Sequence, residues 1–70
     1  MIAVKFLHDT PFDRFEGVYK LAVDFYGDVN VNMAYDKETR HIYLEVWGIH
    51  TVEEIKNDLA EYSHWIEVVG

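Results

Sequence analysis

Apolar and polar positions alternate in four short stretches of the chain. These stretches are residues 2–8, 29–35, 41–47 and 66–69. In the first stretch, Ile2, Val4 and Phe6 share one side, as expected for a strand with one buried face. Side chains of a β-strand point alternately to its two faces, so the pattern predicts four strands.

The segment from Phe12 to Tyr26 carries apolar residues every three or four positions, which predicts a helix. Thr10 suits the N-cap, Pro11 suits the first helical position, and Asp13 would complete a capping box. Gly17 interrupts the middle of this helix, where it is expected to permit close packing on the sheet.

A second helix is expected to begin after Thr51, because Thr51 and Glu54 have the spacing of a capping box. Its apolar side consists of Val52, Ile55, Leu59 and Tyr62. The chain is expected to leave this helix near Trp65 or Ile66 and to enter the last strand directly.

The elements follow the order strand, helix, strand, strand, helix, strand, with a polar turn at residues 36–40 between the two middle strands. This order predicts an α+β, ferredoxin-like βαββαβ sandwich in which residues 1–70 form a single domain. Right-handed crossovers give an antiparallel sheet of order 4-1-3-2 with both helices on one face. A plain α+β hairpin arrangement is the alternative if the last strand does not form.

Alternation also predicts which strand residues face the helices. This inward set is Ile2, Val4, Phe6, Val29, Val31, Met33, Ile42, Leu44, Val46, Ile66 and Val68. The opposite face of the sheet is expected to remain open.

The composition narrows the classes of partner. Thirteen acidic residues against six basic ones give a net charge of −7, which repels phosphate backbones and argues against direct binding of DNA or RNA. A basic protein, or one that itself binds nucleic acid, is the electrostatically favoured partner. The absence of cysteine excludes thiolate catalysis, disulfides and zinc–thiolate sites.

The N-terminal segment Met1–Lys5 lacks the basic start and the long apolar stretch of a signal peptide. No apolar run approaches the ~18 residues that a membrane-spanning helix requires. A cytoplasmic protein without membrane contact is therefore expected.

Tyr43 and Trp47 are predicted to lie on the open face of the sheet, with Leu7 as a neighbour. Aromatic side chains on a mixed surface are typical anchors of protein interfaces, so this face is expected to bind a partner protein or a second copy of the chain. The alternative is that these residues only cover the sheet. Stacking on RNA bases is disfavoured because Glu45 lies between the two rings and no basic cluster accompanies them.

A second candidate surface is acidic. Glu54, Asp58 and Glu61 have the i, i+4, i+7 spacing of one helix face, and Glu53 adds to them. A solvated helix face is the ordinary interpretation of this pattern. The alternative is that the carboxylates imitate a phosphate backbone and occupy a nucleic-acid-binding protein, as an inhibitor of the phage or mobile-element type would.

Residues that could carry catalysis or bind a metal are few. His8, His41 and His64 fall toward one end of the predicted sheet, but alternation directs His8 and His41 to opposite faces. His50 is expected at the surface, and Ser63 lacks the glycines of a nucleophile elbow. We therefore predict no catalytic residue, no metal site and no cofactor.

Families that share the predicted topology supply one alternative function. The turn His8-Asp9-Thr10-Pro11 does not resemble the phosphate-binding loop of acylphosphatases, and heavy-metal-associated domains need cysteines there. ACT-type regulatory domains are similar in length and often pair through their sheets. The sequence thus favours a non-enzymatic protein-binding module, with a dimeric, ACT-like domain that senses a small molecule as the alternative.

Overall fold

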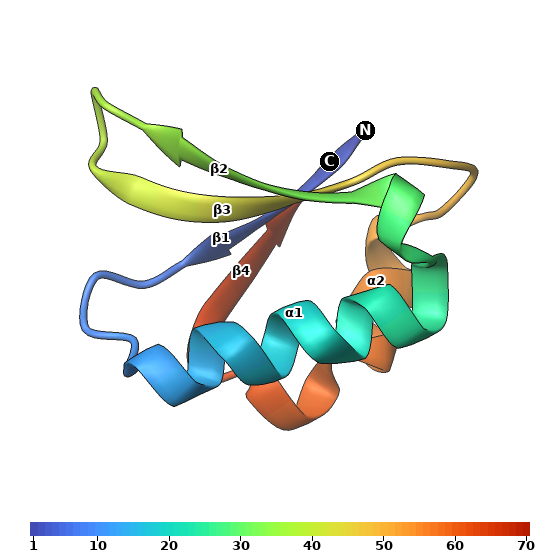
Figure 1. Ribbon diagram of the computed structural model, residues 1–70, viewed down its shortest axis with the longest axis horizontal. Coiled ribbons are helices and arrows are strands. Elements are labelled where there is room, and N and C mark those ends of the chain that lie inside the picture. The colour runs from blue at the N-terminus through green and yellow to red at the C-terminus, as the bar shows by residue number, and fades with distance from the viewer.

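The computed structural model describes residues 1–70 as an antiparallel sheet of four strands with both helices on one of its faces (Figure 1). The elements are β1 (Ile2–Phe6), α1 (Phe12–Tyr26), the 3₁₀ turn η1 (Asp28–Asn30), β2 (Val31–Asp36), β3 (His41–Val46), α2 (Val52–Asp58), the 3₁₀ turn η2 (Ala60–Tyr62) and β4 (Ile66–Val69). The strand order β2-β3-β1-β4 is the predicted order read from the other edge. The ferredoxin-like prediction is therefore confirmed.

The two central strands carry the core. Val4 on β1 lies opposite Leu44 on β3 and Val68 on β4, so inward side chains meet across the sheet. Eleven buried residues form one cluster: Ile2, Val4, Phe6, Val18, Ala22, Tyr26, Val31, Leu44, Val46, Ile55 and Leu59. Hydrophobic burial by the predicted faces of strands and helices thus holds the two layers together.

Helix α2 begins with the predicted capping box. The hydroxyl of Thr51 accepts a hydrogen bond from the backbone N–H of Glu54 at 3.1 Å, and the Glu54 carboxylate accepts one from the Thr51 N–H at 3.3 Å. The helix is shorter than expected, because it ends at Asp58 and is followed by the separate turn η2. The prediction of one continuous helix to Tyr62 was wrong.

The predicted cap of α1 was also wrong. Pro11 occupies the N-cap position, and no side chain caps the helix. The Thr10 hydroxyl instead donates to the carbonyl oxygen of Leu7 at 2.6 Å and lies 3.3 Å from that of Trp65. Thr10 therefore ties the turn after β1 to the segment that enters β4.

Three members of the predicted inward set do not lie in the core. Val29 belongs to η1, where its side chain is 87% exposed, because β2 begins only at Val31. Met33 and Ile42 lie on the helix-facing side of the sheet but remain exposed, since the β2–β3 hairpin curves away from α1 (Figure 1). None of the helices is both long and apolar enough to span a membrane.

Candidate protein-binding surfaces

Three separate segments meet at one end of the molecule, on the right in Figure 1. They are the end of α1 with η1, residues 47–51 after β3, and the beginning of α2. The backbone N–H of Trp47 donates to the carbonyl oxygen of Asn30 at 2.8 Å, and the Asn30 side chain donates to the carbonyl oxygen of Tyr26 at 2.9 Å. These two bonds fix η1 against the segment that follows β3.

A polar cluster lies beneath this end. The Tyr26 hydroxyl donates to the Asp58 carboxylate at 2.9 Å, and the Tyr26 ring packs edge-on against His50 at a centroid distance of 4.8 Å. Burial raises the pKa of the Tyr26 hydroxyl well above its usual value, and the hydrogen bond to Asp58 and the nearby Glu54 charge raise it further. The cluster therefore joins α1 to α2 with Tyr26 in its neutral form.

His50 is less accessible than the sequence led us to expect. Its Nδ1 atom is buried without a hydrogen-bond partner, and the nearest Glu54 carboxylate oxygen lies 3.4 Å away. The expectation of a plain surface residue was wrong, because Gly48 turns the chain with a φ of 110° and lets the His50 ring fold back beside it.

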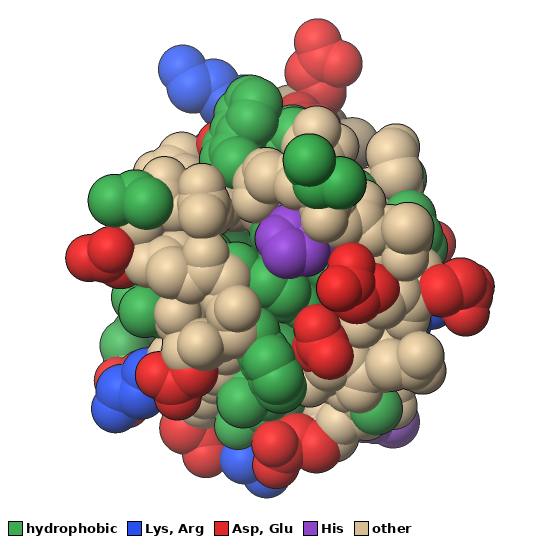
Figure 2. Space-filling model, turned by 90° about the vertical axis from the view of Figure 1, so that its right-hand side faces the viewer, with side chains coloured by type: hydrophobic (Ala, Val, Ile, Leu, Met, Phe, Trp, Pro, Cys, Tyr) green, Lys and Arg blue, Asp and Glu red, His purple; other side chains and the backbone are tan.

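Four large apolar side chains project from this end into solvent. Phe25 is 52% exposed, Val29 87%, Trp47 48% and Ile49 fully exposed. The exposed carboxylates of the same segments are Asp24, Asp28, Glu53 and Glu54. We call these eight residues the loop end. Figure 2 shows this side of the molecule as a band of hydrophobic side chains with acidic groups on either side.

The loop end carries little positive charge. In its segments the one basic side chain is Lys56, which lies 3.9 Å from Glu53. Exposed apolar groups rimmed by charge are typical of protein-binding sites. The sequence placed Trp47, Glu53 and Glu54 among its candidates but missed Phe25, Val29 and Ile49, whose proximity depends on contacts between distant segments.

The predicted acidic series does not form one helix face. Glu61 lies in η2, beyond the end of α2. Asp58 is half-buried against Tyr26, and Glu54 caps its own helix. Only Glu53 and Glu61 are both exposed and free of a role in the folded core or in capping. The structure thus divides the four carboxylates between structural and surface positions.

The open face of the sheet holds the other predicted residues. Tyr43 lies near its middle, opposite Lys5 on β1 and Ala34 on β2. Leu7 follows the last residue of β1 and Trp47 follows the last residue of β3, and because these strands are antiparallel the two side chains lie at opposite ends.

Polar contacts occupy the space between these apolar residues. Lys5 and Glu67 form an ion pair at 3.1 Å, and the Asn32 side chain donates to Glu45 at 3.1 Å. The structure therefore unites Trp47 with the loop end and leaves Leu7 apart from it.

The histidines are arranged differently from the prediction. His8 and His41 lie on the same side, and their rings stack at a centroid distance of 3.9 Å with 12° between the planes. Alternation ends at Phe6, so the turn that follows β1 is free to place His8 over His41. His64 packs edge-on against Trp65 instead.

Backbone carbonyl groups engage one nitrogen of each stacked ring. His8 Nε2 lies 3.1 Å from the Thr39 oxygen, and His41 Nδ1 lies 2.8 Å from the Phe6 oxygen. Lone pairs of imidazole lie in the ring plane, so two parallel rings do not direct them at one point. No three side chains of the metal-binding types come together anywhere in the chain.

No family model, curated protein or solved structure matches this chain.

Proposed function

We propose that this chain is a non-enzymatic protein-binding module whose loop end docks onto a partner with a basic, partly apolar surface. One observation carries the proposal. Phe25, Val29, Trp47 and Ile49 are exposed at one end of the molecule together with four carboxylates, on segments that hydrogen bonds of Trp47, Asn30 and Tyr26 hold in place. Apolar anchors surrounded by a polar, solvent-accessible rim are the usual arrangement of a protein interface.

The distribution of charge supports a basic partner. The stretches 12–20 and 31–40 contain acidic and basic residues in equal number: Asp13, Glu16, Asp36 and Glu38 against Arg14, Lys20, Lys37 and Arg40. The whole net charge of −7 therefore falls on the rest of the chain, which includes the loop end. Such a field speeds the encounter with a positive surface and weakens as salt rises.

A narrower form of the proposal is that the partner binds nucleic acid and that the loop-end carboxylates occupy its phosphate-binding surface. The support is chemical, since Asp24, Asp28, Glu53 and Glu54 present negative charge with one basic side chain among them. Competition by double-stranded DNA distinguishes this form from binding to a basic protein of another kind.

The test is an affinity pulldown from source-cell lysate at low and at moderate salt, with bound proteins quantified by mass spectrometry. The loop-end variant combines Trp47→Ala with Ile49→Ser. The matched control is Val69→Ser, which removes an apolar side chain of similar exposure from the open sheet face. Circular dichroism verifies that each variant is folded.

The proposal requires a protein that is retained by the wild type and by Val69→Ser, lost by the loop-end variant, and weakened by salt. Displacement of that protein by DNA supports the narrower form. A lysate that yields no such protein, or one that both variants retain equally, contradicts the proposal.

A further inference from the structure

An unpaired backbone edge runs along β2, the outermost strand on one side of the sheet. The bond from Trp47 N–H to the Asn30 carbonyl marks residues 30 and 47 as a hydrogen-bonded pair. In an antiparallel ladder such pairs recur at every second residue, so Asn32 and Ala34 direct their backbone groups at β3. Met33 and Tyr35 direct theirs outward, whereas the Val31 N–H already bonds to the Asp28 oxygen.

The outward edge lacks the usual protection of an exposed strand. Residues 31–35 contain no charged side chain and no proline, and the ladder with β3 runs without a bulge. Natural proteins place lysine, proline or a bulge on an edge that must stay unpaired. A strand of this composition is therefore suited to pairing with another strand.

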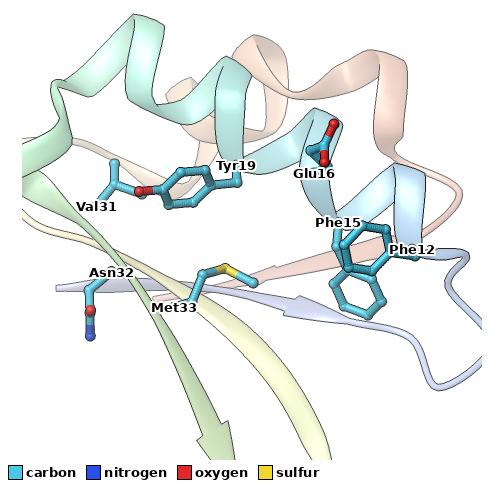
Figure 3. Close-up of a pocket in the computed structure, with 7 residues that line it drawn as sticks. All are labelled: Phe12, Phe15, Glu16, Tyr19, Val31, Asn32 and Met33. Atoms are coloured by element: carbon cyan, nitrogen blue, oxygen red, sulfur yellow. The ribbon is translucent and has the colours of Figure 1, made fainter.

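An apolar groove of about 440 Å³ lies beside this edge, between α1 and β2. Its lining residues are Phe12, Phe15, Glu16, Tyr19, Val31, Asn32 and Met33. Figure 3 shows the aromatic side chains on α1 and the Met33 side chain on β2 directed toward the space between these two elements. Phe12 is 79% exposed and the neighbouring Tyr35 is 56% exposed, so the groove is open to an apolar occupant.

We propose that the occupant is a second copy of this chain, joined β2 to β2 in antiparallel fashion about a two-fold axis at Ala34. This register places Met33 of each copy opposite Tyr35 of the other, and the four free backbone groups of each strand then form four bonds between the copies. Ala34 meets its equivalent at the axis, where its small side chain allows close approach. The Val31 N–H keeps its bond to Asp28.

The same register also supplies an occupant for the groove. Side chains that lie opposite each other in a ladder share one face of the sheet. Tyr35 of the second copy therefore lies beside Met33 on the helix side, where the groove opens next to Phe12. Two-fold symmetry makes every contact occur twice, so the surface that one strand and one groove bury is buried again on the second copy. The doubled area counts toward the ~1,200–2,000 Å² of total buried surface in a stable interface.

Charge favours a second copy over the basic partner proposed for the loop end. The stretches 12–20 and 31–40 that surround the groove carry no net charge, so two chains of net charge −7 meet on neutral faces. Lys37 and Arg40 are the two basic side chains without an ion pair in one copy. Antiparallel pairing brings their turn beside η1 of the second copy, where Asp28 lies.

Single cysteines test the register directly, because the chain contains none. In Ala34→Cys the two thiols would face each other as a non-hydrogen-bonded pair, with Cα atoms ~4.5 Å apart and within disulfide range. Asn32→Cys is the control on the same strand and the same face, but its two copies would lie about four residues apart, ~13 Å. Under mild oxidation, Ala34→Cys is expected to become a covalent dimer and Asn32→Cys to stay monomeric. Equal or faster cross-linking of Asn32→Cys overturns the proposal.

Sedimentation velocity from micromolar to millimolar protein supplies the second test. The wild type is expected to dimerise, and Tyr35→Lys is expected to weaken the dimer by about tenfold or more, because it places a charge in the partner's groove. Trp47→Ala, on the open face, is the control and should leave the dimer intact. Circular dichroism confirms that Tyr35→Lys is folded.

A wild type that stays monomeric throughout overturns the proposal. So does a dimer that Trp47→Ala abolishes and Tyr35→Lys spares, since that result indicates pairing through the open sheet face. A monomeric wild type leaves the loop-end proposal untouched, since the pulldown measures binding to a different protein.

Discussion

The Tyr62 hydroxyl occupies the place that a Cβ atom at Gly17 would take. An ideal Cβ there would also lie 2.8 Å from Cζ of the same tyrosine, which is closer than real atoms approach. Gly17 thus allows close packing of α1 against η2, and not against the sheet as its position in the sequence suggested. This contact joins the two helical segments on one side of the sheet.

Gly17→Ala is therefore expected to lower the free energy of unfolding by ~1–3 kcal/mol, the usual cost of overpacking. Helix propensity alone predicts the opposite, a gain of about 1 kcal/mol. Urea denaturation followed by circular dichroism measures the difference. In a Tyr62→Leu background the clash is relieved and Gly17→Ala should become neutral or stabilising. Equal destabilisation in both backgrounds would contradict the packing explanation.

The capping box of α2 predicts that Thr51→Ala lowers the free energy of unfolding by about 1 kcal/mol. The physical reason is that the Glu54 N–H loses its hydrogen-bond acceptor. Thr51→Ser retains the acceptor and serves as the control in the same thermal or chemical unfolding measurement. If Thr51→Ser destabilises the chain as much as Thr51→Ala, the hydroxyl is not the source of the stability.

The raised pKa of Tyr26 predicts a loss of folding stability in alkaline solution. Its pKa in the folded chain is raised above the unfolded value of ~10, so the folded state favours the neutral hydroxyl. This contribution is complete below about pH 10 and is lost as the pH rises further, because the unfolded chain ionises first. Melting temperatures between neutral and strongly alkaline pH should therefore fall more for the wild type than for Tyr26→Phe. Parallel curves for the two proteins would exclude this role of Tyr26.

The lowered pKa of Asp36 predicts a loss of folding stability in acid. Its carboxylate accepts a hydrogen bond from the Glu38 N–H at 2.9 Å, and this bond, with a second from the Thr39 N–H, lowers its pKa. A lowered pKa in the folded chain gives stability that is present above the usual value of ~3.9 and is lost as the pH falls.

Asp36→Asn keeps a neutral acceptor for these bonds, so the acid-induced fall in melting temperature should be smaller in this variant than in the wild type. Lys37→Gln, in the same turn, is the control and should follow the wild-type curve. An unchanged acid response in Asp36→Asn would show that the turn does not depend on the charge.

The alternation of β1 and β3 was sufficient to predict strands with one buried face, because Val4, Phe6, Leu44 and Val46 are buried while the residues between them are only partly buried. The order of the elements along the chain and right-handed crossovers then predicted the order of the sheet. The same reasoning failed at Val29. The series Val29-Asn30-Val31 alternates like a strand, yet Gly27, with a φ of 86°, directs the chain into η1 first. The local hydrophobic pattern does not reveal that the Asn30 side chain donates a hydrogen bond to the Tyr26 carbonyl oxygen.

The candidate sites depended even more on distant contacts. Thr10 has the sequence environment of a helix cap, but its hydroxyl reaches the carbonyl group of Trp65, which lies far along the chain. The loop end combines residues from three segments, and only Trp47 and the carboxylates of α2 drew attention in the sequence. The groove beside β2 arises where the β2–β3 hairpin curves away from α1, and periodicity along the chain does not encode how two elements diverge.

The other edge of the sheet limits how large an assembly can become. β4 has four residues, against six in β2, and its Glu67 carries a charge. In the proposed dimer both β2 edges are consumed, so each outer boundary of the eight-stranded sheet is a short, charged β4. A third copy finds no edge of the β2 kind, and growth stops at two. The inequality of the two edges thus separates a closed pair from an open-ended fibre.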